Sequence, residues 1–185
     1  MTFSAPTDRI VADIRSWLER GVLGLDLCPF ARRPYETGRV RIAVSRADRE
    51  DALVADLDGE LRRLAEADPE ALETTLLASP LLFDDFLDFN DFLDLADAVL
   101  RALGLEGELQ VVGFHPDYRF ADAPPDDPAN CTNRSPVPIL HLLREESVAR
   151  AVAGLDDPDA IYRRNIETLR RLGEAGWREW IEGGR

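Results

Sequence analysis

Short apolar runs alternate with longer segments of helical periodicity along this chain, and this alternation constrains its fold more than any other feature. Four runs have the length and composition of strands: 39–45, 72–79, 109–114 and 138–143. Two segments with apolar residues at helical spacing separate the first three runs: 48–67 and 84–103. Because a helical crossover joins parallel strands, the pattern predicts an α/β fold.

The remaining segments add helices at both ends of the chain and leave the direction of the last strand open. Apolar residues share one face of the segment from Pro6 to about Gly21, and helical patterns return over 145–153 and after Asp157-Pro158. If the fourth strand is antiparallel to the third, the fold is better described as α+β. We therefore expect a single globular domain over residues 6–182, with a mixed sheet of about four strands covered by helices. Residues 1–5 and 183–185 are expected to be flexible.

The charge of the chain restricts the ligands that it is expected to bind. The formal net charge is −14 at pH 7, and all 22 basic residues are arginines. So acidic a protein repels phosphate backbones, and we do not expect it to bind nucleic acid. The absence of lysine excludes Schiff-base chemistry and a P-loop lysine.

Neither a membrane segment nor a disulfide framework is indicated by the sequence. No apolar run approaches the ~20 residues that a membrane span needs, and no signal-peptide pattern precedes the first helix. Two cysteines in 185 residues do not form a disulfide framework. We therefore expect a cytoplasmic protein with free thiols and no membrane association.

The stretch 113–145 holds both histidines and is the richest part of the chain in chemically active side chains. His115 ends the third predicted strand, and His141 lies among leucines in the fourth. If these strands are antiparallel neighbours, the fourth begins near His115, and His141 lies about 10 Å further along it. This spacing predicts that the two histidines share a pocket at the sheet edge. Cys28, in a stiff apolar loop before Pro29, is the distant residue most suited to join them.

A shared site of Cys28, His115 and His141 would support two kinds of chemistry. With a metal, it has three ligands and an open position, as in catalytic zinc sites, so zinc or another divalent ion is a candidate cofactor. Without a metal, Cys28 is a candidate nucleophile and a histidine its base, with Asp117 orienting the imidazole. The alternative is structural, because lone cysteines and histidines in apolar strands are usually core residues.

Arginines and polar residues in and around the same stretch favour an anionic ligand. The loop that follows His115 is long enough to suggest a functional role, and arginine offers a planar fork for carboxylate or phosphate. Under the alternative interpretation, the same arginines form ion pairs with acidic residues of the loop and pin it in place. The candidate substrate-binding residues are Arg119, Asn133, Arg134, Ser135, Arg32 and Arg144.

The segment 84–88 matches the aspartate motif DDxxD, which binds Mg²⁺ and a diphosphate in isoprenoid synthases. Those enzymes also need a large all-helical cavity and a second acidic motif. In this chain, aspartate simply recurs every third residue along one side of the helix predicted over 84–103. We interpret this side as a solvated helix face.

Four motifs, in order along the chain, resemble the signatures of an uncharacterised family of bacterial proteins, a domain of unknown function. They are LCPFA at 27–31, GFHPDY at 113–118, NRSP at 133–136 and LHLLRE at 140–145. The similarity extends from about Ile10 to Leu172 and implies a small cytoplasmic bacterial protein of one domain. It brings no catalytic assignment. Cys131 stands where an aromatic residue is usual in the family, which makes it the weaker thiol candidate.

Two functional hypotheses follow from these residues. The first is a small cytoplasmic enzyme with a Cys/His/Arg pocket that acts on a small anionic substrate. The alternative is a non-catalytic module that binds an anionic metabolite or a partner protein. For either hypothesis, the ligand is expected in the crevice outside the carboxyl ends of the parallel strands.

Overall fold

The computed structural model describes residues 6–155, 157 and 159–182, so the two predicted flexible termini and Pro158 lie outside the described residues. Its centre is a sheet with the strand order β1-β2-β4-β3. The strands are β1 (Val40–Val44), β2 (Thr74–Ala78), β3 (Leu109–Phe114) and β4 (Ile139–Arg144). Each lies within one or two residues of a predicted apolar run.

The directions of the strands make the sheet mixed, as the sequence predicted. β1 and β2 are parallel, whereas β4 is antiparallel to both of its neighbours, β2 and β3. It follows that β1, β2 and β3 all point the same way and that their carboxyl ends share one edge of the sheet. The expectation of a mixed sheet covered by helices is confirmed.

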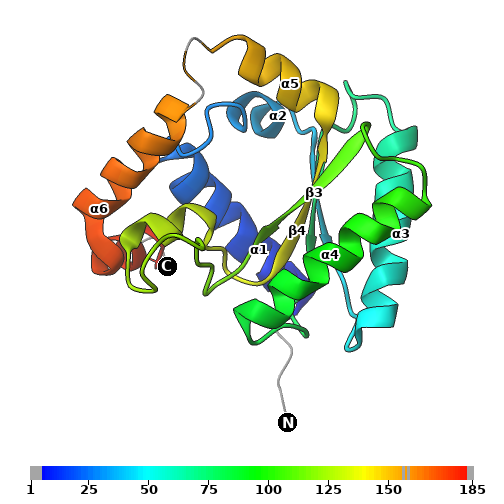
Figure 1. Ribbon diagram of the computed structural model, residues 1–185, viewed down its shortest axis with the longest axis horizontal. Helices are drawn as coiled ribbons and strands as arrows, with labels where there is room; N and C mark the ends of the chain where they lie inside the picture. The colour runs from blue at the N-terminus through cyan, green and yellow to red at the C-terminus, as the bar shows by residue number, and fades with distance from the viewer. Residues whose placement is uncertain (1–5, 156, 158, 183–185) are drawn as a thin grey trace.

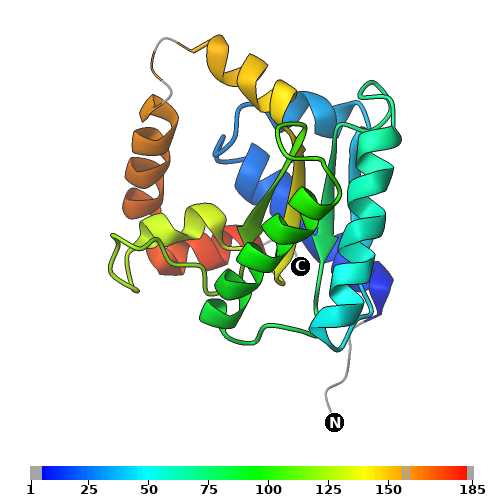
Figure 2. The same ribbon diagram turned by 45° about the vertical axis from the view of Figure 1, so that its right-hand side comes forward.

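Helices cover both faces of this sheet (Figure 1). On one face lie α3 (Glu50–Glu66) and α4 (Phe86–Ala102). On the other lie α1 (Thr7–Trp17), its π-helical continuation η1 (Leu18–Leu23) and α6 (Asp159–Glu182). α6 is kinked at Gly173, and its last part packs against η1. The view in Figure 2 shows α3 and α4 side by side, where their side chains pack together.

Three shorter helices complete the described part of the chain. α5 (Glu145–Ala153) follows β4 directly, as the sequence predicted. α2 (Arg32–Glu36) and η2 (Pro128–Asn133) were not predicted, because each is too short to show an apolar repeat. None of the helices among the described residues is long and apolar enough to cross a membrane.

Two hydrophobic cores lie on opposite sides of the sheet. Leu140 and Leu142 of β4 belong to the core under α3 and α4, while Ile139 belongs to the core under α1. This alternation is the ordinary consequence of the strand repeat, in which successive side chains point to opposite faces. The same alternation determines which candidate side chains lie on the same face of the sheet and can contact one another.

Candidate functional site

His115 lies at the carboxyl end of β3, and protein groups engage both of its ring nitrogens. Nδ1 accepts a hydrogen bond from the backbone N–H of Asp117 at 3.0 Å, so the proton is on Nε2, which donates to the Phe83 carbonyl at 2.8 Å. The ring is 1% exposed and packs against the rings of Phe86 and Phe89 of α4. His115 therefore fastens the end of β3 to the loop that precedes α4.

His141 lies on the other face of the sheet. Its Nε2 is 2.8 Å from the hydroxyl oxygen of Thr74, and that hydroxyl donates its own proton to the Leu142 carbonyl at 2.6 Å. The Thr74 oxygen therefore accepts, and Nε2 of His141 donates. The imidazole lies 5.7 Å from the ring of Phe114. Burial lowers the pKa of His141 to about 4, so the side chain is neutral at pH 7.

The structure does not bring the two histidines into the shared pocket that their spacing predicted. β3 and β4 are antiparallel neighbours, which is the condition on which that prediction depended, and His141 pairs with Val112. Paired residues share a face of the sheet, but Val112 and His115 are three residues apart and so point to opposite faces. The sheet itself lies between the two imidazoles.

Cys28 lies in the loop between η1 and α2, on the same side of the sheet as α1. Burial raises the pKa of the thiol, while hydrogen bonds from the backbone N–H groups of Phe30 and Ala31 act in the opposite direction but are the smaller effect. The side chain is therefore a protonated thiol at pH 7. The described residues contain no group of three or more His, Cys, Asp or Glu side chains that could hold a metal ion.

Two of the predicted substrate-binding arginines hold the fold together. Nη2 of Arg144 donates to the carbonyls of Leu64, Ala67 and Leu72 at 2.6, 2.8 and 3.1 Å, and so fixes the end of α3 to the turn before β2. Arg134 contacts Glu174 of α6 at 3.4 Å and donates to the Pro125 carbonyl at 3.3 Å. Their side chains are mostly buried, and it is their Nη groups that make these structural contacts. The Nε atom of each is buried without a hydrogen-bond partner among the described residues.

The remaining candidates fall into two groups. Asn133 and Ser135 lie beside His115, because the Asn133 carbonyl accepts from the His115 N–H and the His115 carbonyl accepts from the Ser135 N–H. Asp117 is exposed in the same turn, and the guanidinium of Arg119 lies 5.8 Å from the centre of the Phe86 ring. Arg32 lies apart from them near Cys28, where it donates to the Leu23 carbonyl and pairs with Glu36.

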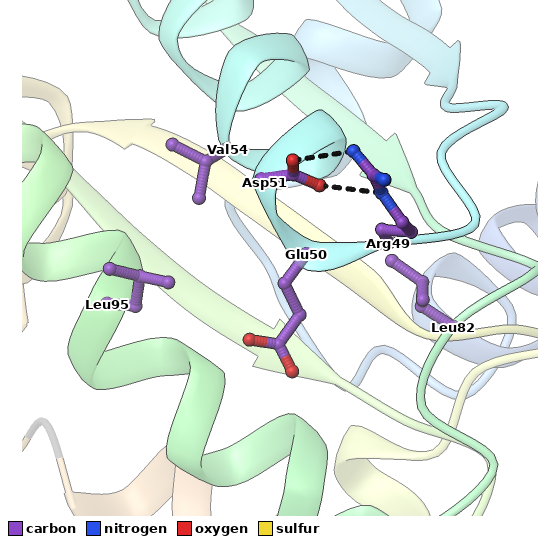
Figure 3. A pocket seen from close by; sticks show the side chains of 6 residues that line it. All are labelled: Arg49, Glu50, Asp51, Val54, Leu82 and Leu95. Atoms are coloured by element: carbon purple, nitrogen blue, oxygen red, sulfur yellow. Dashed lines mark hydrogen bonds and ion pairs between the residues drawn. The ribbon is translucent and has the colours of Figure 1, made fainter.

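Two concavities of the described structure adjoin one another between α3 and α4. One hollow has a volume of about 720 Å³ and is lined by Arg49, Glu50, Asp51, Val54, Leu82 and Leu95 (Figure 3). The second has a volume of about 420 Å³ and is lined by Glu50, Leu82, Phe83, Asp88, Asp91, Phe92 and Leu95. Because they share Glu50, Leu82 and Leu95, we treat them as one groove, called the α3–α4 groove below.

The charged side chains of the α3–α4 groove are mainly unpaired carboxylates. Its one arginine, Arg49, donates two hydrogen bonds to Asp51, at 3.1 and 2.7 Å. In Figure 3 the Glu50 side chain extends from the start of α3 toward α4, away from that pair. Within the described part of the chain, no arginine forms an ion pair with Glu50, Asp88 or Asp91. All three side chains are exposed.

The local fold explains how these residues come together. Glu50 begins α3 shortly after β1, and Leu82 and Phe83 lie in the loop after β2, so the groove opens at the carboxyl edge of the parallel strands. Asp88, Asp91 and Leu95 are three and four residues apart and form one stripe along α4. Phe83 has a positive φ of 66°, and its carbonyl is the group that His115 holds.

This groove was not predicted from the sequence, although one signal of it was present. The interpretation of the aspartates of 84–103 as a solvated face groups Asp88 and Asp91 with Asp94 and Asp97. Only the first two line the groove. The signal is the apolar Leu95 within the acidic stripe, which is 40% exposed.

Comparison with known proteins gives a family but no function. The model of a family described as "Protein of unknown function (DUF1415)" matches residues 9–179. No curated protein and no solved structure matches the chain.

The lowered pKa of His141 makes a prediction about stability. The unfolded chain takes up a proton at this residue below its ordinary pKa of 6.5, whereas the folded chain does so only near pH 4. His141 therefore makes its full contribution to the free energy of unfolding above pH 6.5. This contribution is lost as the pH falls toward 4, by up to about 1.4 kcal/mol for each pH unit. In urea titrations between pH 7 and 4, His141→Gln is expected to lose less stability than wild type. Equal losses in the two proteins would contradict the burial of a neutral imidazole.

Proposed function

The chain belongs to the DUF1415 family of proteins of unknown function, and we propose that it is a non-catalytic binding module that holds a positively charged partner in the α3–α4 groove. The observation that carries the proposal is the set of three unpaired carboxylates, Glu50, Asp88 and Asp91, around one exposed leucine, Leu95, and two partly buried aliphatic side chains. This groove also lies where the crevice rule expects a ligand, outside the carboxyl ends of β1 and β2.

Electrostatics favour a cation over the anion that the arginines suggested. At 4 Å, a cation and a carboxylate attract by roughly 1 kcal/mol in water and about 4 kcal/mol near a protein surface with an effective dielectric constant of 20. An ammonium or guanidinium group that enters the groove is attracted by Glu50, Asp88 and Asp91, and an anion is repelled. Because these carboxylates are exposed, each pair contributes at the lower end of this range. The Nη groups of Arg134 and Arg144 already bond to protein groups, and both side chains are largely buried, so neither arginine presents an open guanidinium fork to an anion.

The protonation states of the candidate catalytic residues favour binding over catalysis. A Cys–His pair needs a thiol with a lowered pKa or a base able to take its proton. In this chain burial raises the pKa of Cys28 and lowers the pKa of His141 to about 4, so proton transfer between them is unfavourable. His115 has no free ring nitrogen. The enzyme hypothesis therefore has weaker physical support than the binding hypothesis.

Alkylation of Cys28 tests the non-catalytic part of the proposal. Because its pKa is raised, Cys28 is expected to react with iodoacetamide at pH 7.5 several-fold more slowly than the same cysteine in the urea-unfolded chain. Peptide mapping by mass spectrometry separates Cys28 from the buried Cys131 in one sample. Faster reaction in the folded protein would identify an activated thiolate and restore the enzyme hypothesis.

Substitution of the groove carboxylates tests the charge of the ligand. Wild type is expected to bind the peptide tetralysine at low ionic strength, as measured by isothermal titration calorimetry. The double variant Asp88→Asn with Asp91→Asn is expected to bind it at least tenfold more weakly, since two of three attracting charges are removed. Tetraglutamate should not bind.

The matched control removes two charges from the same helix outside the groove. Asp94 and Asp97 are exposed on α4 but do not line either hollow. The variant Asp94→Asn with Asp97→Asn has the same net charge as the test variant and should retain binding within about threefold. Equal losses in the two variants would show a diffuse attraction to an acidic protein and would overturn the proposed site.

A further inference from the structure

We propose that the natural occupant of the α3–α4 groove is a peptide segment of a partner protein that places an aliphatic side chain next to basic ones. This inference rests on the proposed function and adds the chemical class of the partner. It follows from the arrangement of the groove, which has an aliphatic part and an acidic part side by side.

The aliphatic part is formed by Val54, Leu82 and Leu95. Figure 3 shows the side chains of Val54 and Leu95 on α3 and α4, on opposite sides of the hollow. Leu95 is 40% exposed, which leaves an apolar surface open in a strongly acidic region. A leucine, isoleucine or methionine side chain of a ligand would remove this surface from water, which a simple cation does not do.

The acidic part adjoins it and has a spacing that suits a peptide. Asp88 and Asp91 are one helical turn apart on α4, with roughly 5–6 Å between their Cβ atoms. Glu50 extends from the start of α3 toward α4 and belongs to both hollows, and Asp88 and Asp91 line the second of them. A lysine or arginine stem can lie along Leu82 while its charged end reaches the carboxylates.

Charge complementarity selects a different protein over a second copy of this chain. Each copy carries a net charge of −14, so the overall electrostatic interaction between two copies is repulsive. A basic segment is instead attracted from a distance and is steered to the groove. A polyamine would satisfy the acidic part but would leave Val54 and Leu95 exposed to water.

The test compares two synthetic peptides of equal charge. Both carry two lysines that flank a central pair of residues, which is Leu-Leu in one peptide and Ser-Ser in the other. In calorimetry with wild type, the leucine peptide is expected to bind at least tenfold more tightly. Leu95→Ala should weaken binding of the leucine peptide about five- to tenfold and leave the serine peptide within twofold. Leu87→Ala is the matched control, because Leu87 is 58% exposed on the same helix and lines neither hollow.

The outcomes separate this inference from the proposed function. If both peptides bind wild type equally, the groove recognises charge alone. This result would contradict the inference of an aliphatic-containing peptide, while the proposed binding of a positively charged partner would remain. If Leu87→Ala weakens the leucine peptide as much as Leu95→Ala does, the contact lies elsewhere on α4 and the inference fails. If neither peptide binds and tetralysine does not bind either, the proposed function fails with it.

Discussion

The insertion of β4 between β2 and β3 is the constraint on which the rest of this structure depends. Because β4 is antiparallel to both neighbours, the three other strands point the same way and end at one edge. The segments that follow β1 and β2 at that edge lead into α3 and α4, which pack side by side on one face. The α3–α4 groove is the space between the starts of these two helices. The same pairing places His141 on one face of the sheet and His115 on the other.

His115 connects the long loop of the sequence to the wall of the groove. Its imidazole joins the turn at Asp117 to the Phe83 carbonyl, and Phe83 lines the groove. A bulky residue with a φ of 66° is costly, by roughly 1–3 kcal/mol, and persists only where its surroundings hold it. A buried hydrogen bond and the packing of the His115 ring on Phe86 and Phe89 supply that support. His115 therefore acts on the groove through the loop that it holds.

Much of the fold was predictable from the sequence, because strand and helix periodicities are local properties. The runs around Val40 and Leu109 and the apolar stripes of α3 and α4 gave their elements to within a few residues. α2 was missed because five residues show no period. The sequence left the direction of β4 open. The faces of the histidines depend in addition on the register, and a shift of one residue reverses them.

The site was much less predictable than the fold, since it depends on how distant elements pack. Glu50 and Asp88 are far apart in sequence and meet only because α3 and α4 lie side by side. Arg144 looked like an anion ligand because nothing in the sequence indicated that three carbonyls at the end of α3 would surround it. The resemblance to a family of unknown function agrees with the match to residues 9–179 and gives no direct indication of a ligand.

The most direct test of a binding groove between α3 and α4 is a map of the backbone amides that respond to a basic, leucine-containing peptide in ¹H–¹⁵N NMR spectra. We expect the largest shift changes at the start of α3, in the loop after β2 and along the first half of α4, including Glu50, Leu82 and Asp91. Amides around Cys28 and His141, on the opposite side of the sheet, should change little. Shift changes centred on Cys28 and α6, with none at Glu50 or Asp91, would contradict the assignment of the groove as the binding site.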